Sequence, residues 1–359
     1  MQPTDAEQAA MHRALVLAET VRGRTSPNPA VGAVVLDADG RLAGEGATDP
    51  PGGPHAEVSA LRQAGPAAAG GTAVVTLEPC AHTGRTGPCV DALLKAGVAR
   101  VVYAVDDPNP EAAGGAARLR EAGVEVIAGI DEHAAETGAL RPWLHAVRTG
   151  RPFVTWKYAA TLDGRTAAAD LTSRWISSPA SRADVHLLRG EVDAILVGSG
   201  TVLADDPQLT VRLGDDPALA VERQPLRVVL DRRHRVPDDA RVLDASAETL
   251  VLDTAAPRFA LKALFDRGVR HVLLEGGPTL AGAFVAAHCV DEVVAYLAPM
   301  LLGAGPNVLG DADIGTLADA ATLDIESVAR IGSDVKLVAR PRWIDDDVAD
   351  PDDESGTEV

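Results

Sequence analysis

Short apolar runs alternate with amphipathic stretches along the first part of the chain. The apolar runs predict strands at 31–36, 42–47, 72–77, 98–105 and 124–127. The stretches between and around them predict helices at 4–22, 55–64, 90–96 and 116–122. Strands that alternate with helices indicate a three-layer α/β/α domain with a mostly parallel sheet. We therefore expect a first domain over residues 1–147.

A helical connection over 131–149, with Trp143 and Leu144 on its buried face, leads to Gly150-Arg-Pro152, where the domain boundary is expected. Beyond it, apolar runs predict strands at 153–160, 194–197, 226–230, 249–252, 271–274, 291–297 and 335–339. Ser178 and Pro179 have the residue types of an N-cap and first position for a helix that ends near Arg189. This pattern predicts a second α/β domain over 152–342.

The composition limits the compartment and the partners. The 359 residues carry a net charge of −19, so a nucleic-acid substrate is not expected. Aromatic residues make up only 3%, so the cores must consist of Ala, Val and Leu. No apolar run approaches the ~18 residues of a membrane span. Three cysteines and a polar N-terminus without a signal-peptide pattern predict a cytoplasmic protein. Residues 343–359 are acidic and are expected to be a disordered tail.

One stretch carries the pattern of a catalytic zinc site. Pro54-His55-Ala56-Glu57 is followed by Glu78-Pro79-Cys80 and then by Cys89. One imidazole and two thiols leave the fourth position of a tetrahedral zinc ion open, as in catalytic sites. A His-x-Glu pair with a later Pro-Cys pair is the signature of zinc deaminases, although here eight residues separate the two cysteines. His55, Cys80 and Cys89 are the predicted ligands, and Glu57 is the predicted proton shuttle.

Taken singly, these residues have plain structural interpretations. His55 alone would be an ordinary histidine, and the two cysteines alone would be small buried residues; Cys289, which has no such neighbours, is expected in the core. Together they predict a site where zinc makes hydroxide available for attack on an aromatic C–NH2 carbon. One carboxylate, Glu57, can take the proton of water and hand it to the departing ammonia.

The segment from Cys80 to Cys89, Cys-Ala-His-Thr-Gly-Arg-Thr-Gly-Pro-Cys, resembles the deaminase half of the bifunctional deaminase/reductase family of riboflavin biosynthesis. The resemblance covers the chain except its acidic tail. It implies a cytidine-deaminase-like first domain that acts on a pyrimidine ribotide. The substrate-binding residues that it implies there are Asn28, His82, Arg85, Asp107 and Asn109. Without the family, Asn28 between two prolines and Asp107-Pro-Asn-Pro110 would both be interpreted as turns.

The chain departs from this family in two loops. Gly87 stands where the family usually has proline, and Gly114-Gly115-Ala116 replaces the usual Gly-x-Gly. The departures affect the expected local geometry and not the expected activity.

The second half resembles the reductase half of the same family. Glu275-Gly-Gly-Pro-Thr-Leu280 is a strand-to-helix turn that suits a phosphate, but it is not Gly-x-Gly-x-x-Gly and alone is a weak signal. Together with the segment from Gly198 to Arg212 it implies a dihydrofolate-reductase-like domain that uses NADPH. The implied substrate-binding residues are Ser173, Arg189, Leu209, Arg212 and Glu275. The implied cofactor-binding residues are Ala159, Trp175, Thr201, Asp205, Gly276, Gly277, Pro278, Thr279, Leu280 and Ala281.

Four residues of this half have specific expectations. Lys157 and Asp205 are placed nearest the reacting sugar carbon, and a surface lysine at a strand end is the alternative for Lys157. Trp175 is as readily a core tryptophan as a cofactor contact. Arg232 stands where the family often has serine, and our hypothesis is that it binds the 2′-phosphate of NADPH.

The resemblance implies two activities on one small-molecule ribotide. The first is hydrolytic deamination of 2,5-diamino-6-ribosylamino-4(3H)-pyrimidinone 5′-phosphate with zinc. The second is reduction of the ribosyl side chain to ribityl with NADPH. A homo-oligomer, dimer or tetramer, is expected from the family. Two alternatives stay open: a deaminase of another small base whose second half only senses a nucleotide, and a non-enzymatic scaffold stabilised by zinc.

Overall fold

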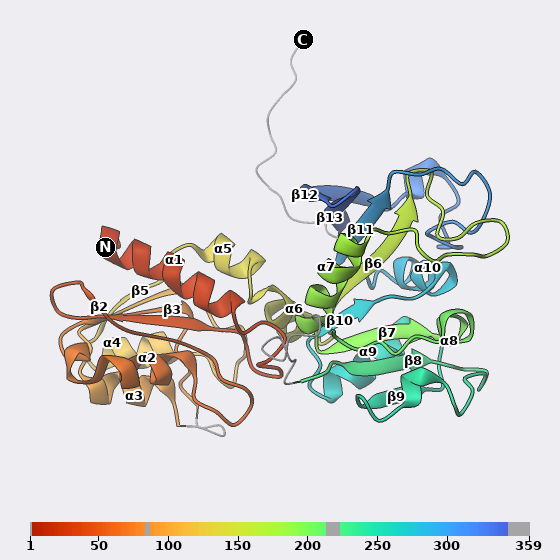
Figure 1. Ribbon diagram of the computed structural model, residues 1–359. Coiled ribbons are helices and arrows are strands. Elements are labelled where there is room, and N and C mark those ends of the chain that lie inside the picture. The colour runs from red at the N-terminus through yellow and green to blue at the C-terminus, as the bar shows by residue number, and fades with distance from the viewer. Residues whose placement is uncertain (1, 83–86, 213–222, 344–359) are drawn as a thin grey trace, which may run out of the picture. The chain divides into compact units, whose positions relative to one another are not determined.

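The structure is a computed structural model that describes residues 2–82, 87–212 and 223–343. The chain forms two compact units, each built around its own sheet (Figure 1). The first comprises Met1–Phe153, Glu191–Asp193 and Lys262–His271. The second comprises Val154–Gly190, Ala194–Leu261 and Val272–Val359.

The first sheet has five strands in the order β2-β1-β3-β4-β5. They are β1 (Gly32–Leu36), β2 (Leu42–Ala47), β3 (Thr72–Leu77), β4 (Arg100–Val105) and β5 (Glu125–Ile127). β1 is antiparallel to both β2 and β3, whereas β3, β4 and β5 are parallel. The predicted strands are confirmed, but the sheet is mixed rather than mostly parallel, because the tight turn at Asp37–Gly40 folds β2 back on β1.

Helices cover both faces of this sheet, as a three-layer domain requires. They are α1 (Asp5–Glu19), α2 (Ala56–Ala64), α3 (Cys89–Ala96), α4 (Gly115–Glu121), α5 (Glu132–Thr137) and α6 (Arg141–Thr149). In Figure 1, α1 and α5 lie on one face and α2, α3 and α4 on the other. The helix predicted over 131–149 is two helices, because Gly138 ends α5. Trp143 and Leu144 are buried, as expected.

Local sequence explains where α1 begins and what it packs on. The Thr4 hydroxyl accepts the N–H of Glu7 at 3.3 Å, and the Glu7 carboxylate accepts the N–H of Thr4 at 2.8 Å. This reciprocal cap satisfies two backbone donors that the helix cannot pair itself. The core beneath is built almost entirely from alanine, valine and leucine, which confirms the expectation from composition.

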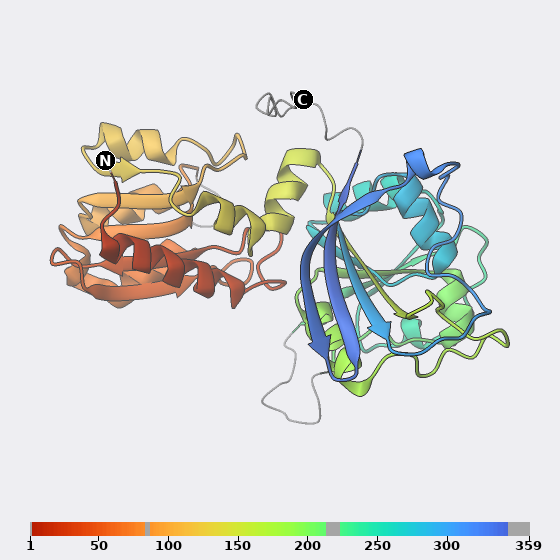
Figure 2. The same cartoon turned by 90° about the horizontal axis from the view of Figure 1, so that it is seen from above.

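The second sheet has eight strands in the order β12-β13-β11-β6-β10-β7-β8-β9. They are β6 (Phe153–Thr161), β7 (Ala194–Gly198), β8 (Leu226–Leu230), β9 (Thr249–Leu252), β10 (His271–Leu274), β11 (Glu292–Ala298), β12 (Thr322–Ile331) and β13 (Asp334–Arg342). The pairs β10-β7, β7-β8, β8-β9 and β11-β6 are parallel, and β13 is antiparallel to its two neighbours. Figure 2 shows β12 and β13 as long blue strands at one edge.

The described residues of the second half include the α-helices α7 (Pro179–Gly190), α8 (Ser199–Asp205), α9 (Pro257–Asp266) and α10 (Pro278–Ala286). The Ser178 hydroxyl accepts the N–H of Ser181 at 3.2 Å, which confirms the predicted cap of α7. Short 3-10 turns are also described: η1 (Gly65–Ala68) in the first unit, and η3 (Arg241–Leu243) and η4 (Leu317–Asp319) in the second. The strand β12 was not predicted.

The ordered fold reaches the start of the predicted tail. The Trp343 indole stacks on the His288 ring at 4.5 Å and donates to the Val290 carbonyl at 3.2 Å. Trp343 is therefore part of the packed second unit and not of a disordered segment. The rest of the predicted tail, 344–359, lies outside the described residues.

Candidate functional site

Three side chains from separate parts of the first unit converge on one point. His55 is the N-cap residue of α2, Cys89 is the first residue of α3, and Cys80 follows β3. The Nδ1 atom of His55 lies 3.7 Å from Sγ of Cys80 and 3.2 Å from Sγ of Cys89. All three donor atoms lie within 4.8 Å of one another. The structure thus brings together the three predicted metal ligands.

The geometry of this group fits zinc. A tetrahedral ion bound at about 2.3 Å to sulfur and about 2.1 Å to nitrogen separates such donors by roughly 3.6 Å. The pKa of Cys80 is lowered to about 4, chiefly by a hydrogen bond from the Cys89 thiol, so a thiolate ligand is present at neutral pH. Both cysteines are buried and His55 is half-buried. Two thiol donors and an imidazole are a set that zinc prefers over magnesium or calcium.

Glu57 lies in the first turn of α2, two residues after His55, and is 5% exposed. Burial raises the pKa of its carboxyl group. The Cys80 side chain, burial and the Glu57 carboxyl group together raise the pKa of the Cys89 thiol. The predicted proton shuttle is therefore buried beside the metal ligands without being one of the three donors.

A second buried carboxylate, Glu78, joins the metal loop to the loop after β4. One oxygen accepts the N–H of Asp107 at 3.2 Å and the other accepts the N–H of Ala116, in the first turn of α4, at 2.8 Å. The Asp107 carboxylate accepts the N–H of Asn109 at 2.8 Å, and burial raises its pKa to about 6. Sequence reasoning did not assign Glu78 a role, although an acidic residue between a buried strand and Pro79-Cys80 was a usable signal.

The α4 end of this arrangement depends on a glycine. A Cβ atom on Gly115 would lie 1.7 Å from the Pro79 carbonyl oxygen. The backbone of α4 therefore packs directly on the residue before Cys80, and this close approach explains a glycine at the second position of Gly114-Gly115-Ala116.

Fewer described contacts fix the other predicted substrate residues of the first unit. The Nδ1 atom of His82 is buried and has no hydrogen-bond partner within the described part of the chain. Asn28 lies in the turn where its N–H donates to the Thr25 carbonyl at 2.9 Å; this fixes its backbone, and no described contact ties its amide to the metal group. Arg85 lies outside the described residues.

In the second unit, three predicted residues form one buried ionic group. The Arg189 guanidinium, from α7, donates to the two carboxylate oxygens of Glu275 at 2.6 and 3.0 Å. Lys157, from β6, lies 3.7 Å from the same carboxylate and is 17% exposed, so it is not a surface lysine. Burial lowers the pKa of Lys157. Burial alone would raise the pKa of Glu275, but Arg189 and Lys157 hold it at about 2.

A second predicted arginine lies next to this group. The Arg212 guanidinium donates to the Thr210 hydroxyl at 2.9 Å, and the Thr210 carbonyl accepts a hydrogen bond from Arg189 at 3.2 Å. The Arg212 N–H donates to Nδ1 of His186 at 3.2 Å. Burial and then the two arginines lower the pKa of His186 to about 4, so its ring is neutral at pH 7. Sequence reasoning missed His186 and Thr210, although His186 stands one helical turn before Arg189.

The arginine pair suits an anionic group, because each guanidinium group can bind phosphate oxygens through two parallel N–H groups. Of the other predicted substrate residues, Leu209 is buried in the same loop and Ser173 is half-buried. The structure therefore brings Arg189, Arg212 and Glu275 together.

The predicted cofactor turn follows β10. Gly277 is the N-cap of α10, and Pro278, Thr279, Leu280 and Ala281 form the helix start. A Cβ atom on Gly276 would lie 2.5 Å from Leu280, so the side chain of Leu280 occupies that space. Thr201, from α8, faces the same turn, with its hydroxyl 3.9 Å from where a Cβ of Gly277 would be. This half-buried helix start has backbone N–H groups of the kind that bind phosphate.

The remaining predicted cofactor residues lie in neighbouring segments. Ala159 is on β6, and Asp205 ends α8, where its carbonyl accepts a hydrogen bond from Arg174 at 2.6 Å. Trp175 is 66% exposed, which rules out the alternative of a core tryptophan. The Arg182 guanidinium lies 4.4 Å from its ring centre. No contact between Lys157 and Asp205 is present among the described residues.

Arg232 is exposed at the end of β8, and the described residues give its side chain no hydrogen bond or ion pair. The side chain of Arg235, three residues later, has a hydrogen-bond partner: it donates to the hydroxyl of Ser199, the first residue of α8, at 2.9 Å. The Asp231 carboxylate accepts the N–H groups of Arg235 and Val236 at 2.6 and 2.8 Å. The turn is thus held by Asp231.

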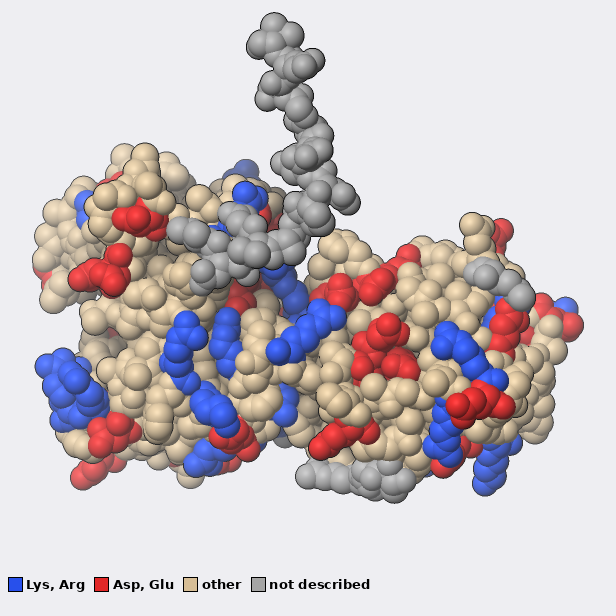
Figure 3. Space-filling model, turned by 180° about the vertical axis from the view of Figure 1, so that it is seen from behind, with Lys and Arg blue, Asp and Glu red and all other residues tan. Residues whose placement is uncertain are grey.

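The face of the molecule drawn in Figure 3 carries both acidic and basic side chains. Within the described part of the chain, no helix has both the length and the apolar character of a membrane span.

Known proteins share both units. Residues 152–337 match the family model of the RibD C-terminal domain, and residues 4–105 match the cytidine and deoxycytidylate deaminase zinc-binding region. The riboflavin biosynthesis protein RibD of Mycobacterium tuberculosis is 52% identical over 333 residues, which cover 92% of this chain and 97% of the relative.

Two solved structures are similar over nearly the whole chain. RibD of Acinetobacter baumannii has a TM-score of 0.86 and 40% identity, and covers 94% of this chain and 99% of its own. A protein of Thermotoga maritima has a TM-score of 0.86 and 34% identity with the same coverage. The latter is described as a diaminohydroxyphosphoribosylaminopyrimidine deaminase/5-amino-6-(5-phosphoribosylamino)uracil reductase.

Proposed function

Because the chain belongs to the family of the riboflavin biosynthesis protein RibD, we propose that its two domains act in turn on one pyrimidine ribotide. It is a bifunctional enzyme of riboflavin biosynthesis, a zinc-dependent deaminase and an NADPH-dependent reductase. The domain over 1–147 deaminates 2,5-diamino-6-ribosylamino-4(3H)-pyrimidinone 5′-phosphate. The domain over 152–342 then reduces the ribosyl group to ribityl.

The observation that carries the deaminase assignment is the convergence of His55, Cys80 and Cys89 with a buried carboxylate beside them. When bound by these ligands, zinc supplies the nucleophile, since it lowers the pKa of water toward neutrality. Glu57 takes a proton from that water and delivers it to the departing amino nitrogen, because it is buried next to the ligands. The Asp107–Asn109 loop and His82 orient the base and its ribosyl chain.

The reductase assignment is supported by the buried ionic group of the second unit. NADPH supplies the hydride when it is bound along the Gly276–Ala281 turn, with Ala159, Thr201 and Asp205 beside it. Arg189 and Arg212 hold the phosphate ester of the substrate, and Ser173, Leu209 and Glu275 complete its pocket. Lys157 stabilises negative charge on the opened sugar, since its amino group is held away from solvent 3.7 Å from Glu275.

We also propose a cytoplasmic homo-oligomer. Among the described residues none of the three cysteines is in a disulfide, as a reducing compartment favours. β12 is an edge strand whose Leu323, Ile325 and Val328 are 45%, 62% and 61% exposed. Exposed apolar side chains on a sheet edge form a surface that a second copy would cover. Light scattering of the purified chain measures its oligomeric state, and a monomer at micromolar concentration would contradict the proposed homo-oligomer.

The test of the function uses Glu57→Gln, with Glu121→Gln on the exposed face of α4 as the matched control. Zinc content, ammonia release from the diaminopyrimidine ribotide and NADPH oxidation on the deaminated substrate are measured on the same samples. We expect Glu57→Gln to keep its zinc, to lose about a hundredfold or more of its ammonia release, and to oxidise NADPH normally. The control should match wild type.

The alternatives predict different results. Undiminished ammonia release by Glu57→Gln would remove Glu57 from the mechanism, and no ammonia release by wild type would favour the zinc-stabilised scaffold. If wild type releases ammonia but never consumes NADPH on the deaminated ribotide, the second half is a nucleotide-sensing module.

A further inference from the structure

A fully buried arginine lies behind the loop that carries Thr210 and Arg212. Arg227, on β8, is 0% exposed. Its guanidinium donates to the Asp244 carboxylate at 2.8 Å, to the Ser246 hydroxyl at 3.2 Å and to the Gln208 carbonyl at 3.2 Å. It also donates to the carbonyls of Asp244 and Ala247. A buried cation is costly without such partners, so these contacts are strongly favoured and restrain the groups that Arg227 binds.

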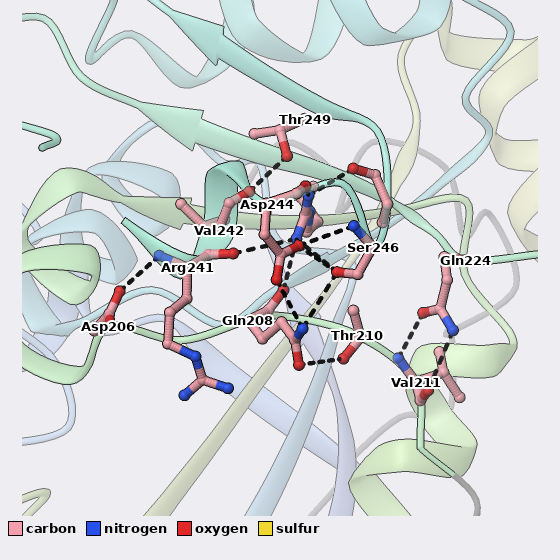
Figure 4. Close-up of polar contacts among 12 residues, drawn as sticks. Asp206, Gln208, Thr210, Val211, Gln224, Arg241, Val242, Asp244, Ser246 and Thr249 are labelled. Atoms are coloured by element: carbon pink, nitrogen blue, oxygen red, sulfur yellow. Dashed lines mark hydrogen bonds and ion pairs between the residues drawn. The ribbon is translucent and has the colours of Figure 1, made fainter. Parts of the chain in front are cut away.

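Gln208 connects this buried centre to Thr210 (Figure 4). Its amide NH2 donates to the Asp244 carboxylate at 2.8 Å. Its amide oxygen accepts hydrogen bonds from the Thr210 hydroxyl at 3.4 Å and from Arg212 at 3.5 Å. Figure 4 shows Gln208 between Asp244 and Ser246 on one side and Thr210 on the other.

Thr210 accepts a hydrogen bond from each arginine of the site. Its hydroxyl accepts a hydrogen bond from Arg212 and its carbonyl accepts one from Arg189. Thr210 is 5% exposed, so it has little freedom to move. The chain of contacts from Arg227 through Asp244 and Gln208 therefore ends at the two guanidinium groups.

The loop itself has a backbone that needs outside support. Asp206 and Leu209 have φ values of +41° and +53°, a left-handed conformation that costs energy for residues other than glycine. Asp206 accepts the N–H of Arg241, and the Gln224 amide bonds both the N–H and the carbonyl of Val211, at 2.7 and 3.2 Å (Figure 4). Strained backbone persists only where its surroundings determine it on several sides.

We propose that Arg227, Asp244 and Gln208 are positioning residues that hold the Thr210–Arg212 segment so that Arg189 and Arg212 bind the phosphate ester of the reductase substrate. The inference rests on the proposed reductase site, since it assigns the phosphate to that arginine pair. None of the three residues needs to touch the substrate. They act because two guanidinium groups must be held at a fixed separation to bind one phosphate together.

The test uses Gln208→Ala and Asp244→Ala in the full chain, with Asp238→Ala as the matched control. Asp238 is exposed in the same segment and has no hydrogen bond or ion pair in the described structure. KM and kcat are measured for NADPH-dependent reduction of the deaminated ribotide. Binding of ribose 5-phosphate is measured by calorimetry, and binding of NADPH by its fluorescence. NADPH binding by the same molecules reports whether the second unit is folded, and ammonia release reports on the first unit.

We expect both variants to raise KM for the ribotide by about tenfold and to weaken ribose 5-phosphate binding to a similar degree. The value of kcat should change by less than about twofold, because uniform binding is lost and not transition-state binding. NADPH binding, ammonia release and the Asp238→Ala control should match wild type. A lower melting temperature without these changes would indicate a merely structural role.

The idea fails if Gln208→Ala leaves both KM and ribose 5-phosphate affinity unchanged, whatever Asp244→Ala does. Failure of the proposed function is a separate outcome, because it would appear as a wild-type chain that never oxidises NADPH with the deaminated ribotide. The binding of ribose 5-phosphate still tests the positioning role in that case.

Discussion

The Arg189 guanidinium holds the Glu275 carboxylate by two hydrogen bonds, at 2.6 and 3.0 Å, inside the second unit. The side chains of the two residues are only 13% and 8% exposed. This ion pair comes from α7 and from the end of β10, so it ties a helix to the sheet. Its charge state therefore affects both the stability of the unit and the geometry of the proposed site.

The pair makes the stability of the second unit depend on acid pH. The pKa of Glu275 is lowered to about 2, whereas an unfolded glutamate titrates near 4.3. Its stabilisation is therefore complete above about pH 4.5 and is lost as the pH falls toward 2, on the order of 3 kcal/mol in all. Glu275→Gln should remove this component. The melting temperature of the second unit, identified as the transition whose midpoint NADPH raises, is recorded from pH 7 to 3. Equal slopes of melting temperature against pH in the variant and the wild type would contradict the prediction.

The metal site predicts that substitutions of Cys89 and of Cys289 have different effects on zinc content and ammonia release. Cys89→Ser should lose most of the bound zinc and about a hundredfold or more of the ammonia release, because a serine hydroxyl is a poor zinc ligand. Cys289→Ser is the control, since Cys289 is equally buried but belongs to the core of the second unit. Elemental analysis together with both activities measures this. Full zinc content in Cys89→Ser would exclude Cys89 as a ligand.

The contact of Gly115 with Pro79 predicts that a single methyl group disturbs the deaminase. In Gly115→Ala the new Cβ would collide with the Pro79 carbonyl, so α4 and the Cys80 loop must separate, at a cost of about 1–3 kcal/mol. We expect weaker zinc retention and slower ammonia release, with normal NADPH oxidation. Gly87→Ala is the control, because a Cβ there meets nothing within 4 Å. Zinc retention during dialysis is compared between the two variants. Equal retention in both would contradict a role for the contact between Gly115 and Pro79.

The hypothesis for Arg232 concerns the choice of cofactor. If its guanidinium binds the 2′-phosphate of NADPH, Arg232→Ala should reduce the preference for NADPH over NADH by roughly tenfold. Arg235→Ala is the informative companion, since Arg235 is bonded to Ser199 whereas Arg232 is exposed. Dissociation constants of both cofactors, measured by fluorescence, give the answer. An unchanged preference in Arg232→Ala with a change in Arg235→Ala would transfer the role to Arg235.

The metal site was predictable because its residues are local in sequence. His55 and Cys89 each open a helix and Cys80 follows a buried strand, so three short-range patterns place three ligands. The expected alternation of strands and helices was also enough for the three-layer domain. The antiparallel pairing of β1 with β3 was not, because pairing depends on where the chain crosses and not on the pattern within a strand.

Long-range partners explain what sequence reasoning missed. Arg227 looks like a polar residue at the start of a strand, and its burial depends on carbonyls and a carboxylate from 208 and from 241–247. Glu78 gains its role from the N–H groups of Asp107 and Ala116. β12 was missed because its residues are exposed on both faces, so no clear alternation of apolar and polar positions marks it.

Glu78 also limits how this enzyme can be redesigned. The Asp107–Pro110 loop, which we propose orients the base, is the segment to exchange with a relative in a test of base specificity. Because Glu78 accepts the N–H groups at both ends of the connection, Asp107 and Ala116, a grafted loop must have the same length and reproduce both donors. A graft that fails to do so leaves a buried carboxylate without partners one residue away from Pro79-Cys80. A loop exchange intended to change substrate specificity would then be observed as a loss of bound zinc.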